Sequence, residues 1–435
     1  RDYLPSYVVN ELSQAYIFLR TVEHRLQQYA DQQTHKLPQD DIARLRLAYS
    51  MGFASWEEFS RVLDKHRQRV QSDFEQVFAA PQVEHASEDK HSLREVWLEL
   101  LEEGVAYEVL TKAGFSEPQQ ALDYIKATHR TSAYVSLSRQ GKERMDKLMP
   151  LLLGAVGHYD NENRVLKRLL NLLEAIARRT SYLALLGENP MALSQLVRLC
   201  AASPWIVHQI AKQPVVLDEL LDPRTLYLPP SRESLIQDLQ QRMEYIDEQD
   251  LEQQMDALRH FKHANVLRVA AADVSEAMPL MVVSDHLTDI AELVLNQVLQ
   301  IAYQHMIRRH GLPGHANNSI ENCGFAVIAY GKMGGIELGY GSDLDLVFLY
   351  HGDANGFTDG EKSIANSVFY SRLGQRMIHI LTSFTPAGVL YEVDMRLRPS
   401  GASGLLVTHV DSFRDYQFNQ AWTWEHQALV RARPT

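Results

Sequence analysis

From the start of the chain to about residue 312, apolar residues recur at steps of three and four, the spacing of one face of an α-helix. The segment 11–30 shows this pattern clearly, and Pro38 interrupts it before a second pair of helices that runs to about residue 80. Acidic and histidine residues then replace the apolar ones over 81–92. The pattern predicts a group of helices that ends in a polar linker.

Glycine and proline residues divide the next part of the helical pattern. They separate short helices between 93 and 221, which predicts a helical bundle. A turn-rich joint follows at 222–231, because its consecutive prolines cannot continue a helix. The last long helix is predicted to begin at Ser284, as its N-cap, and to end ahead of Gly311.

After residue 322 the apolar residues change from helical spacing to short runs. Runs rich in β-branched and aromatic residues predict strands at 325–330, 344–350 and 389–397. A helix is predicted between the last two strands, because four apolar residues share one helical face: Phe369, Leu373, Met377 and Ile380. The order strand, glycine-rich connection, strand, helix, strand predicts a small mixed α/β domain.

These boundaries divide the chain into four expected segments. Three are helical, namely a tail at 1–80, a central bundle at 93–221 and further helices at 232–320. The mixed α/β domain occupies 321–435, so the expected fold class is α+β and mostly helical, with N-terminal helical bundles first. The first residues contain neither an initiator Met nor a signal sequence, and we therefore expect a piece of a longer protein.

Composition and charge narrow the classes of function. Of the 435 residues, 45% are hydrophobic and 23% are charged, and no apolar run approaches the roughly 20 residues of a membrane-spanning helix. The formal charge of −12 disfavours a groove for nucleic acid, which needs clustered Lys and Arg. Cys200 and Cys323 stand far apart, which favours a reducing cytoplasm over a disulfide framework. We expect a cytoplasmic protein with a protein or small-molecule substrate, without nucleic acid or membrane as a partner.

The connection between the first two predicted strands contains five glycines: Gly331, Gly334, Gly335, Gly339 and Gly341. Glycines let the backbone approach a ligand closely, and amide groups at a helix N-terminus bind phosphate. A tight strand-to-helix turn explains the same glycines. Lys332 beside them is either a phosphate ligand or a solvated side chain.

Three carboxylates follow the glycines. Asp343 and Asp345 share one face of a strand, with Cα atoms about 6–7 Å apart. Alternation in the later strand puts Asp394, Arg396 and Arg398 on one face. Three carboxylates within about 5 Å would repel one another by roughly 3 kcal/mol per pair at an effective dielectric of 20, so such a cluster needs cations. They are either solvated or arginine-paired strand-end residues, or the ligands of two Mg²⁺ ions for phosphoryl or nucleotidyl transfer, and the joint pattern favours the second interpretation.

These residues resemble the nucleotidyltransferase superfamily, whose pattern is a Gly-Gly or Gly-Ser pair, then Asp-x-Asp, then a third Asp on a later strand. Gly334-Gly335, Asp343, Asp345 and Asp394 stand at those places. Within it, the chain most closely resembles the glutamine synthetase adenylyltransferase family. The strings that carry this resemblance are YGKMGGIELGYGSDLDLVFLY, LYEVDMRLRPSGASGLLV and AWTWEHQALVRAR, with AYIFLRTVEHRLQ and LRVAAADV among the helices.

The family resemblance implies two nucleotidyltransferase copies in one polypeptide, the first removing AMP from glutamine synthetase and the second attaching it; residues 339–346 resemble the second, adenylylating copy. The chain resembles the family from the helical tail of the first copy, at 1–80, to the nucleotidyltransferase palm of the second, at 321–435. The family continues past Thr435 into a C-terminal helical domain. The resemblance further implies ATP as AMP donor, a tyrosine hydroxyl as acceptor, and regulation by PII signal protein and glutamine.

The resemblance also implies roles for individual residues. Mg²⁺ or Mn²⁺ is expected on Asp343, Asp345 and Asp394, which are the catalytic residues. The residues expected to contact nucleotide are Gly334, Gly335, Ser342, Lys332, Arg396 and Arg398. The alternative for Arg396 and Arg398 is a salt bridge with nearby carboxylates in place of a contact with nucleotide. Arg431 and Arg433 are further candidates for phosphate ligands.

Two other functions stay open. The same carboxylates would serve the reverse-direction reaction, phosphorolytic removal of AMP from adenylylated glutamine synthetase. Alternatively, the chain is a regulatory scaffold that docks PII, since some 320 of its residues are predicted to lie in the helical part and carry no catalytic constellation. Binding of PII without nucleotide turnover would favour the scaffold.

Overall fold

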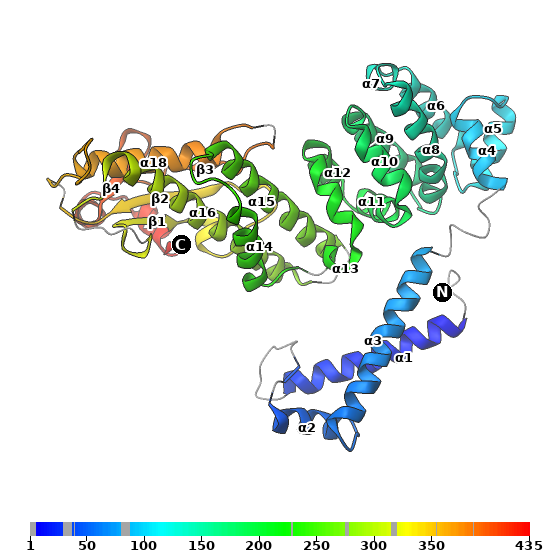
Figure 1. Cartoon of the computed structure of the whole chain (residues 1–435), viewed down its shortest axis with the longest axis horizontal. Coiled ribbons are helices and arrows are strands. Elements are labelled where there is room, and N and C mark those ends of the chain that lie inside the picture. Colours follow the sequence, from blue (N-terminus) through cyan, green and yellow to red (C-terminus); the bar gives the residue numbers. More distant parts are fainter. Residues whose placement is uncertain are drawn as a thin grey trace. The chain divides into compact units, whose positions relative to one another are not determined.

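The computed structural model describes residues 6–28, 37–38, 40–79, 88–227, 229–274, 278–314, 320–353, 355–385 and 387–435 (Figure 1). The chain divides into two compact units, Arg1–Val109 and Leu110–Thr435. All strands of the described residues and all candidate site residues belong to the second unit. The finer division into four segments, expected from the sequence, remains a prediction.

The first unit is helical, and its first three helices enclose a small apolar core. Its helices are α1 (Ser6–Gln28), α2 (Asp41–Ser50), α3 (Trp56–Ala79), α4 (Glu88–Trp97) and most of α5 (Glu103–Lys112). Asp40 caps α2, because its side chain accepts a hydrogen bond from the backbone N–H of Ala43 at 2.9 Å. The linker predicted at 81–92 is wrong from Glu88 onward, where α4 begins; residues 80–87 lie outside the described part of the chain.

The second unit begins with a series of short helices. They are α6 (Pro118–His129), α7 (Ser132–Val135), α8 (Arg139–Val156), α9 (Glu162–Ile176), α10 (Thr180–Glu188), α11 (Pro190–Ala202), α12 (Pro204–Lys212), the 3₁₀ helix η2 (Pro214–Leu221) and α13 (Pro223–Leu226). Pro118, Pro190, Pro204 and Pro214 each occupy the first position of a helix, where the missing N–H costs nothing. The short helices that begin at prolines agree with the sequence pattern, and the bundle at 93–221 as a separate segment stays a prediction.

Three longer helices follow: α14 (Arg232–Glu244), α15 (Leu251–Val274) and α16 (Leu280–His310). The predicted start of α16 at Ser284 is wrong, because Pro279 is the N-cap and Val283 is already a buried helical residue. The carbonyl of Ser284 accepts a hydrogen bond from Thr288, as expected inside a helix. The predicted end is confirmed, since Gly311 follows the last residue with φ 77°.

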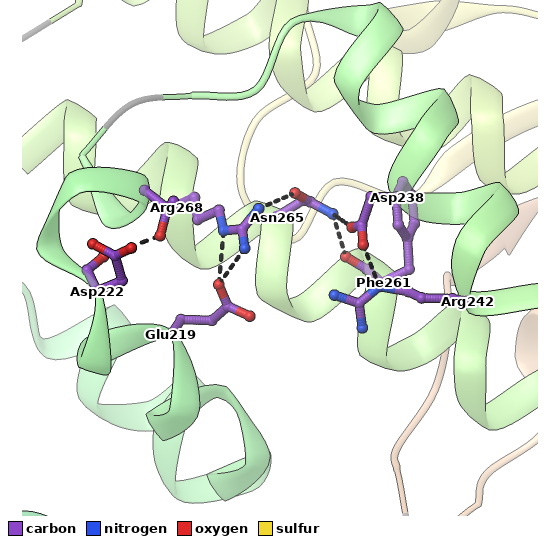
Figure 2. A network of polar contacts seen from close by, with 8 residues as sticks. Glu219, Asp222, Asp238, Arg242, Phe261, Asn265 and Arg268 are labelled. Atoms are coloured by element: carbon purple, nitrogen blue, oxygen red, sulfur yellow. Dashed lines mark hydrogen bonds and ion pairs between the residues drawn. The ribbon is translucent and has the colours of Figure 1, made fainter.

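A chain of polar contacts links α15 to η2 and α14 (Figure 2). Arg268 of α15 is ion-paired with Glu219 of η2 at 2.7 Å and donates to Asn265 Oδ1 at 3.4 Å. The fully buried Asn265 donates to Asp238 of α14 at 3.1 Å, and Asp238 also accepts from Arg242 at 2.7 Å. Because buried polar groups are costly when unpaired, this network fixes how α15 lies against its two neighbours.

A five-stranded mixed sheet follows α16. Its strands are β1 (Phe325–Ala329), β2 (Leu344–Tyr350), β3 (Val393–Asp394), β4 (Val407–His409) and β5 (Arg433–Pro434). The order is β3-β2-β1-β5, with β4 also paired to β2; β1 is antiparallel to β2 and β5, whereas β3 and β4 are parallel to β2. The sequence did not predict β4 or β5, and the strand predicted at 389–397 is wrong except for the two residues of β3.

Helices cover this sheet. The predicted helix is α18 (Asn366–Thr382), and its expected apolar residues are all fully buried: Phe369, Leu373, Met377 and Ile380. One apolar core joins α14, α15, α16, α18 and the sheet. The remaining elements are η3 (Ile320–Asn322), α17 (Gly331–Gly334), η4 (Gly401–Ser403), α19 (Val410–Asn419) and α20 (Thr423–Leu429). The mostly helical α+β fold is confirmed. Within the described ranges, every helix is too short or too polar to span a membrane.

Candidate functional site

The glycine turn between β1 and β2 contains the single helical turn α17. Gly331 begins α17 with φ 54°, and a Cβ atom there would overlap with Asp345 Oδ2. A Cβ atom on Gly334 would overlap with the backbone carbonyl of Arg431. Gly335 is less constrained, since the nearest atoms to its Cβ position are 3.4 Å away. The turn thus brings backbone next to the carboxylate of Asp345.

The three predicted aspartates lie on neighbouring segments of the sheet. Asp343 directly precedes β2, Asp345 is the second residue of β2, and Asp394 of β3 is its partner in the parallel register. Burial raises the pKa of the Asp345 carboxyl, and the charges of Asp343 and Asp394 raise it further, against the opposing charges of Arg396 and Lys332. The structure therefore brings these carboxylates and Lys332 within electrostatic reach of one another.

Arg396 folds back onto Asp394. Its guanidinium Nε donates to both carboxylate oxygens, at 3.0 and 2.7 Å, and its backbone N–H donates to Oδ1 at 2.8 Å. These hydrogen bonds lower the pKa of Asp394. The salt bridge that the sequence left open for Arg396 is thus present, and its side chain is 82% exposed. An exposed arginine in such a pair is accessible to another anion. Its contact with nucleotide stays a prediction.

The chemistry of this acidic set suits a hard divalent cation. Carboxylate oxygens are the ligands that Mg²⁺ and Mn²⁺ prefer. A cation beside Asp345 would offset the burial and repulsion that raise its pKa. Over the described residues, no three acidic, Cys or His side chains are gathered closely enough to bind one ion as they lie. Asp394 would have to exchange Arg396 for the cation, so the residues fit a metal after that local rearrangement.

Arg398 supports the turn that follows β3. It donates to the backbone carbonyls of Met395 at 2.8 Å, Ala402 at 3.0 Å and Gly404 at 3.4 Å. The expectation that alternation would align it with Asp394 is wrong, because the strand ends at Asp394. Its charge still lowers the pKa of Asp394, and nucleotide contact by Arg398 stays a prediction.

Arg433 contacts the glycine turn from behind. It donates to the carbonyls of Met333 and Gly334, each at 3.1 Å, and is ion-paired with Glu292 of α16. The neighbouring Arg431 forms a more exposed ion pair with Glu337 at 2.7 Å. In this structure, therefore, the guanidinium of Arg433 is occupied by the turn it supports. Glu292 was not predicted, because its only signal in the sequence is an acidic residue within an apolar stretch of helix.

Ser342 closes the loop that leads to Asp343. Its hydroxyl accepts from the Gly339 N–H at 3.2 Å, and its own N–H donates to the Gly339 carbonyl at 3.2 Å. Within the same loop, the Tyr340 hydroxyl donates to Asp273 of α15 at 2.9 Å. Neither Tyr340 nor Asp273 was predicted, since nothing in the sequence connects the two.

Comparison with known proteins shows the family to which the chain belongs. A family model described as glutamate-ammonia ligase adenylyltransferase matches residues 193–435, more than half of the chain. The chain belongs to this family. The family resemblance inferred from strings such as YGKMGGIELGYGSDLDLVFLY is thereby confirmed. A second family model, described as GlnD PII-uridylyltransferase, matches residues 1–78.

Curated relatives match the whole chain. A protein of Nitrosococcus oceani is 54% identical over 100% of the chain and 45% of its own length, and one of Thioalkalivibrio sulfidiphilus is 52% identical over 100% and 46%. A relative from Pseudomonas putida is 50% identical over 100% and 45%. All three are named bifunctional glutamine synthetase adenylyltransferase/adenylyl-removing enzymes. The chain spans a little under half the length of these relatives.

Proposed function

We propose that the second unit carries an adenylyltransferase site that moves AMP from ATP to a tyrosine hydroxyl of glutamine synthetase, in the cytoplasm. The observation that carries this proposal is the parallel register of Asp345 with Asp394, beside a turn where Gly331 and Gly334 leave no room for a side chain. The adenylyltransferase named in the relatives supports the same reaction.

Asp343, Asp345 and Asp394 would bind Mg²⁺ or Mn²⁺. When bound, a pair of such ions neutralises triphosphate charge and lowers the pKa of an attacking hydroxyl. In the reaction, the tyrosine oxygen bonds to the α-phosphorus of ATP. The bond from that phosphorus to the bridging oxygen breaks, pyrophosphate leaves with the electron pair, and the hydroxyl proton passes to water.

The other residues would orient the nucleotide. The glycines of α17 let backbone approach the phosphates, and Lys332 supplies a positive charge within electrostatic reach of Asp345. Arg396 is exposed and next to the carboxylates, so it would turn from Asp394 to the triphosphate when a cation takes its place. Positioning of this kind supplies much of the rate in phosphoryl transfer.

The adenylyl-removing reaction is the second candidate. It is favoured by the bifunctional name of the relatives and by the match of residues 1–78 to a second nucleotidyltransferase family. The candidate acidic site lies wholly in the second unit, and the same carboxylates would serve either reaction. Docking of PII to the helical part is an additional proposal that rests on the family resemblance.

Labelled ATP separates these functions. The protein is incubated with Mg²⁺, unmodified glutamine synthetase and ATP labelled at the α- or the γ-phosphate. The proposal expects label on glutamine synthetase from α-labelled ATP alone, and none with Asp345→Asn. Transfer of γ-label, or full transfer by Asp345→Asn, would contradict it. Production of ADP from adenylylated glutamine synthetase and orthophosphate would instead favour the removing reaction.

A further inference from the structure

The sheet alone gives the acidic segments little support. β3 has only two residues, so Asp394 stands at the end of a very short ladder. The loop before Asp343 contains Gly339 and Gly341, the latter with φ 74°, and glycine backbone is intrinsically free to move. A cation bound between the segments needs ligands at fixed separation. Contacts from other parts of the chain therefore add to this short ladder in setting that separation.

Helix α15 contacts the first acidic segment through Asp273. Asp273 Oδ2 accepts the hydroxyl hydrogen of Tyr340 at 2.9 Å, three residues before Asp343. The Tyr340 ring also packs on Trp205 of α12, with ring centroids 4.7 Å apart. Burial and the charge of Asp273 raise the pKa of Tyr340, so the phenol remains a hydrogen-bond donor. These contacts fix the loop from which Asp343 and Asp345 emerge.

The same helix contacts the second acidic segment through Lys262. Its ammonium donates to the Leu390 carbonyl at 2.8 Å, four residues before Asp394, and lies over the Tyr391 ring at 4.4 Å. One turn earlier, the fully buried Arg259 donates to carbonyls of the loop between α18 and β3. Those carbonyls belong to Gly388 and Ser383, both at 2.6 Å. The approach to β3 is thus bonded to α15 at several points.

Between Lys262 and Asp273, α15 forms hydrogen bonds and an ion pair with α14 and η2. Asn265 and Arg268 lie between Lys262 and Asp273, and they connect α15 to α14 and η2 through the network of Figure 2. Eleven residues of α-helix span about 16 Å along the axis. A helix fixed in this way presents Lys262 and Asp273 at a constant distance from each other.

We propose that Asp273 and Lys262 are positioning residues which set, through α15, the separation between the Asp343–Asp345 segment and Asp394. Their contacts thereby determine how tightly the acidic site binds a divalent cation. This inference rests on the proposed function, because it requires that the three aspartates bind the cation.

The test measures binding of Mn²⁺ alone, without nucleotide, by the electron paramagnetic resonance signal of the free ion. Lys262→Met keeps the length of the side chain but removes the donor to Leu390, and Asp273→Ala removes the acceptor of Tyr340. Each is expected to raise the Kd for Mn²⁺ by about 10- to 100-fold, the usual effect of removing the partners that orient metal ligands. Tyr340→Phe should act like Asp273→Ala, and the two together should add little to either.

Arg242→Gln is the matched control. It breaks the ion pair with Asp238 in the same network but leaves the bond between Asp238 and Asn265, and Arg242 contacts neither acidic segment. Its Kd for Mn²⁺ should stay within about twofold of wild type, since an ion pair between residues four apart on one helix contributes little. Thermal unfolding of every variant shows that binding is measured on folded protein; if Lys262→Met does not fold, Tyr340→Phe, which conserves packing, carries the test.

The outcomes separate the two proposals. Wild-type affinity in Asp273→Ala, Tyr340→Phe and Lys262→Met, with binding lost in Asp345→Asn, would overturn the positioning role and leave the proposed function standing. If Arg242→Gln loses as much Mn²⁺ affinity as Asp273→Ala and Lys262→Met, the positioning role would also be overturned. Loss of any contact in the helical part would then explain the weaker binding. Equal Mn²⁺ binding by wild type and Asp345→Asn would contradict the proposed function itself.

Discussion

Gly331 and Gly334 are the two glycines of the turn that cannot carry a side chain without overlap. At Gly331 both the positive φ and the proximity of Asp345 exclude a Cβ atom. At Gly334 the excluded volume belongs to the carbonyl of Arg431. Gly335 differs, because it has a negative φ of −81° and the nearest atoms to its Cβ position are 3.4 Å away. The three glycines look equivalent in the sequence, but the structure shows that only Gly335 has room for a side chain.

Gly331→Ala is expected to destabilise the protein and weaken Mn²⁺ binding. A residue forced into the left-handed region costs on the order of 1–3 kcal/mol, and the new methyl group would displace the Asp345 carboxylate. Gly335→Ala, in the same turn, should unfold close to the wild-type temperature. Thermal unfolding and Mn²⁺ titration of both variants make the comparison. Equal stability of the two would show that the turn relaxes freely around residue 331.

Arg433→Gln is expected to destabilise the glycine turn that contains α17, because Arg433 bonds to its backbone. It removes the donors to Met333 and Gly334, and leaving such carbonyls unpaired costs roughly 1–3 kcal/mol. Arg431→Gln removes only an exposed ion pair with Glu337 and should cost less than about 1 kcal/mol. Binding of a fluorescent ATP analogue should weaken in Arg433→Gln and stay near wild type in Arg431→Gln. The opposite order would identify Arg431 as the phosphate ligand.

At the scale of elements, helices and strands with a long apolar pattern are predicted correctly and very short ones are not. The bounds predicted for β2 agree with the structure, and α18 has its expected buried face, because both carry long apolar runs. The strand predicted at 389–397 ends at Asp394, since polar and apolar residues continue to alternate through a turn that Arg398 stabilises. β4 and β5 were missed because two or three residues show no period.

Lys262 of α15 is expected to make the free energy of unfolding of the protein depend on pH. Burial and the charge of Arg259 lower the pKa of Lys262 from 10.5 to about 8. Between these values the unfolded chain binds the proton and the folded chain does not, so rising pH favours the folded state. From about pH 7.5 to about pH 9.5, wild type should gain about 2 kcal/mol over Lys262→Met. Urea unfolding at both pH values checks this; a constant difference would mean that Lys262 keeps an ordinary pKa.

At the scale of the whole molecule, the site combines local and distant residues. The sequence predicts Asp343, Asp345 and Asp394 as metal ligands because glycines and alternating strands surround them, and the structure places them on neighbouring segments of the sheet. It could not identify Asp273, which is 67 residues from Tyr340 along the chain. Arg433 likewise meets Gly334 across 99 residues. Single-sequence patterns report local spacing, so they pointed to Arg433 as a candidate ligand but did not reveal its contact with the turn, and they gave no sign of Asp273.

Ligand binding should stabilise the second unit without stabilising the first. The candidate site lies wholly in Leu110–Thr435, and a ligand stabilises only the cooperative unit that binds it. Mn²⁺ with ATP at about 100 times the Kd should add about 2.7 kcal/mol to that unit. Amide hydrogen exchange should then slow across 331–350 and in α15, and stay unchanged in α2 and α3.

Asp345→Asn is the control for this effect, because it removes a proposed ligand while leaving a side chain of nearly the same shape. The variant should show the wild-type exchange pattern without ligand and no slowing with it. Slowing of equal size in α2 and α3 would mean that the two units unfold as one, and the assignment of ligand binding to the second unit would then be wrong. Slowing that persists in Asp345→Asn would mean that Mn²⁺ and ATP bind away from the three aspartates.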